Sequence, residues 1–169
     1  MQIEAENMNK NNTDNVFQMV RFNELENLKK IVNETNVNRF VNEYKQNLLH
    51  EAVAYDALEI LNYLLSCNIN INKQDDEGKT PLHYSVDHNN YKFTKLLLNA
   101  KGIEKDIKDQ YGNNAMWVAV FNSDGDYDIV KLLKEYGIES NSKNNSNRSP
   151  LDLAKQFEDE ELQRILTSN

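Results

Sequence analysis

The 169-residue sequence contains little cysteine, proline or glycine, with one Cys, two Pro and five Gly. The single cysteine, Cys67, excludes a disulfide within the chain and a zinc site built on cysteines. So few Pro and Gly leave little room for flexible linkers, and the length suits one domain or one short array of repeats. We therefore expect one structural unit in a reducing compartment, the cytoplasm.

Long apolar runs and clusters of positive charge are also missing. No stretch approaches the roughly 18 apolar residues that cross a bilayer, and the opening MQIEAENMNKNNTDN lacks the apolar core of a secretory signal. Lys and Arg number 19 against 27 Asp and Glu, which gives a formal net charge of -8. This charge, without a Lys/Arg cluster interleaved with aromatics, counts against nucleic acid or an anionic membrane as partner and favours a basic protein.

One short phrase recurs through the chain. The segments NLLHEA, TPLHYS, NAMWVA and SPLDLA begin at residues 47, 80, 114 and 149, which lie 33, 34 and 35 residues apart. An apolar segment follows each of the first three, as LEILNYLLSCN, YKFTKLLLNAKG and YDIVKLLKEYG, and a polar turn precedes each phrase. Self-similarity at this period indicates stacked helical repeats, because one such unit cannot bury its apolar face alone.

The order of residues within the phrase predicts a turn followed by a capped helix. Gly78 stands where the turn needs a positive φ. Thr80 and Ser149 can cap a helix through their hydroxyls, and a proline follows each at the first helical position. His50 and His83 lie three residues after the cap and are expected to bond the cap or turn backbone, a structural role rather than a catalytic one. The residues expected to point inward are Leu49, Leu82, Met116 and Leu151.

On these features the chain, from about residue 13 to 169, resembles the ankyrin-repeat proteins. The stretch NININKQDDEGKTPLHYS is the nearest to the family consensus. The resemblance implies an all-α solenoid of stacked helix–turn–helix hairpins with polar β-turn tips, about three full repeats between two caps. The expected units are a disordered tail over 1–12, an N-terminal capping repeat over 13–44, ankyrin repeats over 45–77, 78–111 and 112–146, and a C-terminal capping repeat over 147–169.

Three positions depart from the family pattern. Trp117 replaces the motif histidine, so the third repeat is expected to lack that hydrogen bond and to pack an indole between helices instead. Lys45 and Asn147 replace the turn glycine. Asn tolerates the left-handed region and Lys tolerates it poorly, so we expect a remodelled first turn.

The inserted stretch NSDGDYD, residues 122–128, is expected to form a loop between two helices. Its oxygens are spaced like the start of a calcium loop. Tyr127 and Leu133, however, stand where such a loop needs glycine and a bidentate glutamate, so we expect a polar loop and no metal.

Catalytic groups are few. His50, His83 and His88 are the only histidines, and no spacing brings them to Cys67 as a nucleophile pair. There is no glycine-rich phosphate loop and no paired-carboxylate signature. We therefore expect no catalytic residue and no cofactor.

Since no catalytic or cofactor site is expected, the remaining hypothesis is a protein-binding surface. The resemblance implies a concave face made by the turn tips and the first helices, where family members bind proteins. Tyrosine buries much contact area with few rotors to fix, and carboxylates would complement a basic partner. The alternative is that these rings only cover neighbouring turns. Carried over by position, the partner-binding residues are Tyr44, Glu51, Tyr55, Asp76, Glu77, Tyr84, His88, Tyr111, Val118, Phe121 and Asn122.

We expect a non-catalytic protein-binding module that is monomeric when unbound. Its acidity and small size favour an inhibitor, similar to the immunity proteins that block a cognate toxin, often a basic nuclease, by covering its active site. An adaptor, or a secreted effector that binds a host protein, is the alternative. An enzyme is the third hypothesis, which loss of turnover on substitution of His88 or Cys67 would support.

Overall fold

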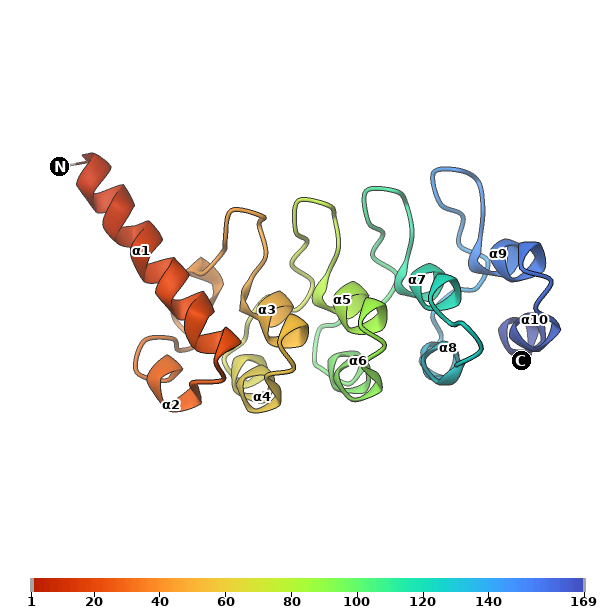
Figure 1. The fold of residues 1–169 in the computed structure, drawn as a ribbon, viewed down its shortest axis with the longest axis horizontal. Helices are drawn as coiled ribbons and strands as arrows, with labels where there is room; N and C mark the ends of the chain where they lie inside the picture. The colour runs from red at the N-terminus through yellow and green to blue at the C-terminus, as the bar shows by residue number, and fades with distance from the viewer. Residues whose placement is uncertain (1, 169) are drawn as a thin grey trace.

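The computed structural model describes the backbone of residues 2–168 and the side chains of residues 12–168. The chain forms a row of helical hairpins (Figure 1). The hairpins are α3 (Leu48–Ala54) with α4 (Leu58–Ser66), α5 (Pro81–Asp87) with α6 (Tyr91–Leu98), α7 (Ala115–Phe121) with α8 (Asp128–Glu135), and α9 (Pro150–Gln156) with α10 (Glu160–Thr167). The row begins with α1 (Gln2–Arg21), the short α2 (Leu25–Leu28) and a 3-10 turn, η1 (Val37–Arg39). Over residues 2–168 the only extended pairing is one isolated antiparallel bridge between Val41 and Asn47.

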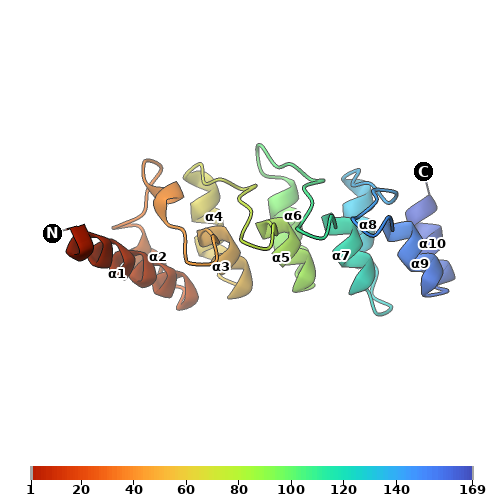
Figure 2. The same cartoon turned by 90° about the horizontal axis from the view of Figure 1, so that it is seen from above.

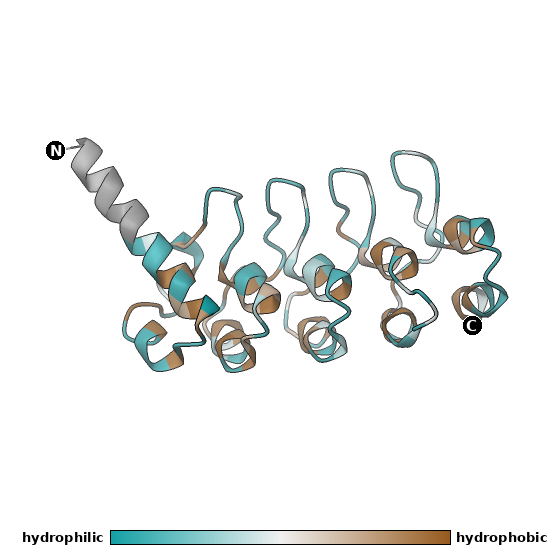
Figure 3. Cartoon of the chain, in the orientation of Figure 1, coloured by the Kyte–Doolittle hydropathy of each residue, from teal (hydrophilic) through white to brown (hydrophobic). Residues whose placement is uncertain are grey.

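The helices lie in two layers. The inner helices α1, α3, α5, α7 and α9 stand side by side, and the outer helices α2, α4, α6, α8 and α10 lie behind them (Figures 1 and 2). Each inner helix contacts the next one in the row. Hydrophobic residues lie on the helices, while the turns between hairpins are mostly hydrophilic (Figure 3).

The core runs along the row between the two layers. Leu49, Leu82 and Met116, at matching positions of successive inner helices, are at most 1% exposed. Leu151, at the same position of α9, is half-buried and packs against the same core. The predicted all-α solenoid, with these side chains along one spine, is confirmed.

The inner helices of the repeats begin at the capping residues that the sequence predicts. Asn47, Thr80 and Ser149 each form a reciprocal capping box with the side chain three residues on. Pro81 and Pro150 occupy the start of their helices, where no backbone N–H is needed.

Two histidines join successive repeats. The Nε2 of His50 donates to the Lys79 carbonyl (3.1 Å), and the Nε2 of His83 donates to the Asn113 carbonyl (3.2 Å). The Nδ1 of each ring accepts the backbone N–H of its own cap residue, at 3.2 Å in both repeats. Each neutral imidazole therefore caps its own helix and also donates a hydrogen bond to a backbone carbonyl in the turn before the following inner helix.

We call the polar turns before α3, α5, α7 and α9 the tips. Each tip contains an amide or carboxylate side chain whose oxygen accepts the N–H groups two and four residues later, at 2.8–3.1 Å. These Asx turns give all the tips one shape. The residues at this position, which were not predicted from the sequence, are Asn42, Asp75, Asp109 and Asn144.

A backbone ladder joins consecutive tips. An N–H of each later tip donates to a carbonyl of the tip before it: Asp76 to Tyr44 (2.9 Å), Gln110 to Glu77 (2.8 Å) and Asn145 to Tyr111 (2.9 Å). At the glycines of the second and third tips the approach leaves no room for a side chain. A Cβ on Gly78 would lie 2.9 Å from the backbone nitrogen of Gln110, and one on Gly112 would lie 2.8 Å from that of Asn145.

The first turn differs from what the sequence predicts. Lys45 takes a φ of 59° and its turn keeps the same Asn42 hydrogen bonds as the other tips, so the prediction of a remodelled turn is wrong. The Asx bonds stabilise the turn enough to hold a lysine in the left-handed region. Asn147 takes the same conformation, with a φ of 57°.

Trp117 stacks on Phe121, with ring centroids 5.3 Å apart. Its indole Nε1 is buried and has no hydrogen-bond partner within the described residues. The third repeat therefore lacks the tie that the histidines make, as the sequence predicts.

The predicted repeat boundaries at residues 45, 78, 112 and 147 fall within the tips. The disordered tail predicted over residues 1–12 falls mostly outside the described side chains. Its backbone, from Gln2 on, forms the first turns of α1, in a stretch without the proline or glycine that would interrupt a helix.

Four of the five inner helices, α1, α3, α5 and α9, are followed by a left-handed residue that is not glycine. Asn23, Asp56, Asn89 and Glu158 have φ values of 49° to 56°. Residues with a Cβ are strained in this region, and Asn and Asp tolerate it better than Glu does.

Replacing Glu158 by glycine is therefore expected to raise the free energy of unfolding, by about 0.5–1 kcal/mol, because glycine takes this φ without a steric clash. Equilibrium denaturation in urea measures the change. The matched control is Glu158→Ala, which retains the Cβ and is expected to give no gain. A glycine variant no more stable than the alanine variant would contradict the strain at this position.

The capping histidines predict a loss of stability in acid. Burial lowers the pKa of His50 from its usual 6.5 to about 4, and burial also lowers the pKa of His83. Below pH 6.5 the unfolded chain therefore binds protons that the folded chain does not, so the free energy of unfolding falls as the pH drops from 6.5 toward 4. Denaturant midpoints measured across this range test the slope.

Replacing both His50 and His83 by glutamine should lower stability at neutral pH and flatten the slope between pH 6.5 and 5. His88→Gln is the matched control, because it removes an exposed histidine and leaves both capping imidazoles and their hydrogen bonds in place. A wild-type slope in the double variant would assign the pH dependence to other groups.

Candidate protein-binding surface

The exposed members of the predicted contact set lie at two edges of the row. One group is on the tips and consists of Tyr44, Asp76, Glu77 and Tyr111. The other is at the C-terminal ends of the inner helices and consists of Tyr55, His88, Phe121 and Asn122. In Figure 2 the helix ends form the lower edge, away from the tips.

On the tip edge, two tyrosines flank a pair of acids. Tyr44 and Tyr111 expose 55% and 58% of their surface. Asp76 and Glu77, on the tip between them, are exposed as well. Because the ladder bonds Asp76 to Tyr44 and Glu77 to Gln110 through the backbone, the spacing of these side chains is set by the fold. This edge presents ordered rings and carboxylates to a partner.

Glu51 was predicted to be exposed, and this is wrong. It is 4% exposed and forms an ion pair with Arg21 of α1. The same guanidinium lies 5.6 Å from the ring centroid of Tyr55. Helix α1 therefore covers the carboxylate that would face a partner, and Glu51 attaches α1 to the first repeat.

Tyr84 and Val118 are half-buried. The Tyr84 hydroxyl donates to Asp75 Oδ2 (2.8 Å) and accepts from Gln46 Nε2 (2.6 Å), and its ring forms a T-shaped contact with the His50 ring. Burial and the bond to Asp75 raise the pKa of Tyr84. Its hydroxyl thus links two tips, and an alanine substitution here would test stability as much as binding.

The histidines and the cysteine, which are the candidate catalytic side chains, lie apart or already make contacts within the fold. His50 and His83 are held in their caps, and Cys67 is buried at the end of α4. His88 stacks on Tyr84, with ring centroids 6.5 Å apart. In the part of the chain that the structure describes, no three His, Cys, Asp or Glu residues are placed to hold a metal ion.

The inserted 122–128 loop uses its own carboxylates. Asp126 Oδ1 accepts the Asp128 N–H (3.1 Å), and Asp126 Oδ2 accepts from Asn89 Nδ2 (3.3 Å) of the preceding repeat. These bonds lower the pKa of Asp126. The loop is tied to its neighbour by direct polar contacts.

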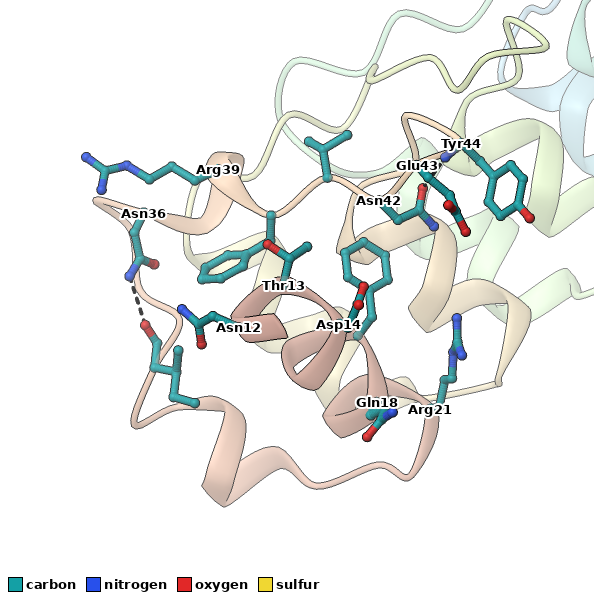
Figure 4. Close-up of a pocket in the computed structure, with 14 residues that line it drawn as sticks. Asn12, Thr13, Asp14, Gln18, Arg21, Asn36, Arg39, Asn42, Glu43 and Tyr44 are labelled. Atoms are coloured by element: carbon teal, nitrogen blue, oxygen red, sulfur yellow. Dashed lines mark hydrogen bonds between the residues drawn. The ribbon is translucent and has the colours of Figure 1, made fainter. Parts of the chain in front are cut away.

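A groove of about 1220 Å³ lies between α1 and residues 36–44. Figure 4 shows Thr13 and Asp14 of α1 on one side and Asn42 and Glu43 of the first tip on the other, with Arg39 pointing away. The groove shares only Tyr44 with the predicted contact residues. We therefore place the candidate surface on the edges of the row.

Residues 16–109, more than half of the chain, match the family model described as ankyrin repeats (3 copies). The chain belongs to the ankyrin-repeat family. Repeats of this family form protein–protein interaction modules and are in general non-catalytic. No helix among the described residues is long and apolar enough to cross a membrane.

Similar proteins are much longer than this chain. A 75-residue match to the human (Homo sapiens) transient receptor potential cation channel subfamily A member 1 is 37% identical and covers 44% of this chain and 7% of that protein. Rabankyrin-5 of Homo sapiens is 37% identical over 68 residues, 40% of this chain and 6% of its own length. Alpha-latrotoxin-Lg1a of Latrodectus geometricus is 26% identical over 109 residues, 63% of this chain and 8% of its own length. Each match thus spans less than a tenth of the relative's own length.

The Arg21–Glu51 pair gives a test of how α1 is attached. Arg21→Met should destabilise the chain by about 1–3 kcal/mol, because it leaves a buried carboxylate unpaired. The double variant Arg21→Met/Glu51→Met should recover most of that loss, since it removes both charges and keeps the volume. Urea denaturation of the single and double variants measures the coupling. Additive losses in the double variant would contradict a buried, coupled pair.

Proposed function

We propose that the chain binds another protein through the face on which its tips and inner helices lie, and that the partner presents a basic surface there. The observation that carries the proposal is the tip edge, where Tyr44 and Tyr111 are exposed on either side of Asp76 and Glu77. Family membership supports protein binding in general. The side chains on this edge support a basic partner in particular.

Rigidity of the tips favours binding. The Asx turns and the backbone ladder order the residues of this edge before any partner arrives. A surface ordered in advance loses less conformational entropy on association than a flexible loop does. Tyrosine adds large contact area with only two side-chain torsions to fix.

Charge favours a basic partner. The formal net charge is -8, and Asp76 and Glu77 contribute two exposed carboxylates to the centre of this edge. Lys79 pairs with Glu77 at 2.9 Å. Over the four tips, residues 42–46, 75–79, 109–113 and 144–148, five Asp and Glu stand against three Lys and Arg. The negative electrostatic field of the chain raises the association rate of a cationic protein, and added salt screens this field.

We infer further that binding is inhibitory, because a rigid row of tips can cover the active site of a basic enzyme such as a toxin or nuclease without any chemistry of its own. The unbound chain would be a monomer. The encounter would take place in the cytoplasm, since the one cysteine is buried and no disulfide is needed. An adaptor would bind the same partner and leave its turnover unchanged, so stoichiometric loss of the partner's activity separates the two functions.

The double substitution Tyr44→Ala/Tyr111→Ala is expected to weaken the complex with a captured basic partner by about 2–4 kcal/mol, with little change in thermal stability. Raising the salt concentration should weaken the wild-type complex too, chiefly through slower association. Calorimetric titration and stopped-flow mixing measure the two effects.

Tyr91→Ala is the matched control for this measurement. Tyr91 exposes 42% of its surface on the outer helix α6, and its loss should leave the affinity unchanged. Equal losses for the control and the tip variant would move the contact away from the tips.

A further inference from the structure

Every inner helix ends in an exposed ring, which we call the ring row. Rings lie at or directly after the last residue of each inner helix. The four carbocyclic rings expose 46% to 73% of their surface, and the histidine is exposed as well. The members of the ring row, one for each unit, are Phe22, Tyr55, His88, Phe121 and Phe157.

The ring row follows a single edge of the molecule. The inner helices run in the same direction, so their C-terminal ends lie along the lower edge of Figure 2, while the tips project from the top of the row in Figure 1. Phe22 and Phe157, in the first and last units, extend the row beyond the residues predicted from the sequence. The edge is a linear track along the whole row of hairpins.

Polar contacts hold neighbouring ends of this edge together. Asn90 Nδ2 donates to Asp56 Oδ1 (3.0 Å), and Asn122 Nδ2 donates to Asp87 Oδ1 (3.0 Å). Farther along, the Tyr127 hydroxyl donates to Asp159 Oδ2 (2.7 Å). The rings therefore stand on connections that are bonded to one another, and their spacing is set before binding.

The connections along this edge carry carboxylates but no permanently cationic side chain. The connections from inner to outer helix, residues 22–24, 55–57, 88–90, 122–127 and 157–159, contain no lysine or arginine. Arg21, beside Tyr55, shows that a guanidinium fits near a ring of this row. The carboxylates of the connections are Glu24, Asp56, Asp124, Asp126, Glu158 and Asp159.

The interval between neighbouring helix ends matches the repeat of one peptide conformation. Packed helices lie about 8–10 Å apart, and this distance sets the interval between the helix ends that carry the rings. Phe121 lies one residue earlier on its helix than the other four rings do. A polyproline II helix advances about 3.1 Å per residue with three residues per turn, or about 9 Å per turn. One face of such a helix would meet each ring in register, whereas a β-strand places same-face residues only about 7 Å apart.

We propose that the ring row is a docking track for a polyproline II segment of a partner protein, with proline on the rings at every third residue and arginine or lysine facing the carboxylates between them. Aromatic side chains bind the preformed proline helix by packing on its rings, at little entropic cost. The track lies on a different edge from the tips, so the proposal goes beyond the function proposed above and does not require that the tips bind.

Synthetic peptides test the track on the intact chain. The probe is (Pro-Pro-Arg)5, compared by calorimetry with (Gly-Ser-Arg)5, which has the same charge and no polyproline II preference, and with (Pro-Pro-Glu)5. We expect (Pro-Pro-Arg)5 to bind about tenfold more tightly than the glycine–serine peptide, and the acidic peptide not to bind. Equal binding of the two basic peptides would overturn the proposal, because charge alone would then account for it.

Substitutions locate the peptide on the chain. Tyr55→Ala/Phe121→Ala should weaken (Pro-Pro-Arg)5 binding by about tenfold or more, and Tyr44→Ala/Tyr111→Ala should leave it unchanged. Phe121 packs on Trp117, so Tyr55→Ala/Phe157→Ala provides a second ring-row variant that does not touch the indole. Wild-type affinity in both ring-row variants, or an equal loss in the tip variant, would overturn the proposal.

The same variants separate this proposal from the proposed function. If the tip variant weakens binding of a captured basic protein and (Pro-Pro-Arg)5 does not bind, only the docking track fails. If the ring-row variants weaken peptide binding while the tip variant leaves binding of the captured protein unchanged, the proposed tip function fails and the docking track stands.

Discussion

The hydrogen bonds that pass from one hairpin to the next are the constraint on which the molecule depends. A hairpin of two short helices buries too little apolar surface to be stable alone, so its neighbours must complete its core. The ladder between tips and the two histidine ties fix the distance and angle at which that burial takes place. Polar bonds at the junctions thus set the register in which the leucines of the spine meet.

The surfaces on both edges follow from that register. The tip residues are spaced by backbone bonds, and the helix ends are spaced by side-chain bonds between connections. Neither edge is built by a single unit. A substitution that tilts one hairpin would therefore displace side chains at both edges, far from the altered residue.

Local signals account for what the sequence predicted well. The caps at Thr80 and Ser149, the prolines after them and the inward leucines depend on residues within one turn of helix. The Asx turns could have been found the same way, because Asn42, Asp75, Asp109 and Asn144 recur with the spacing of the phrase itself. The signal for these turns lies five residues before each phrase.

Tertiary placement accounts for what the sequence could not predict. Glu51 is buried because α1 brings Arg21 onto it from 30 positions away. Tyr84 is half-buried because Gln46, 38 positions earlier, belongs to the adjoining tip. Phe22 and Phe157 were missed because they lie in the end units, where the repeat pattern is weakest. Lys45 adopts a glycine-like turn because its neighbours supply the hydrogen bonds.

The left-handed residues after the inner helices have a consequence for the evolution of the chain. Asp56 and Glu158 hold a conformation in which glycine would be easier, directly beside exposed rings. Selection for thermal robustness alone would favour glycine at such sites, and each change would remove a negative charge from the surface. With the acids in place the fold has a narrower margin against heat than glycine would give it, and the surface beside the exposed rings stays negatively charged.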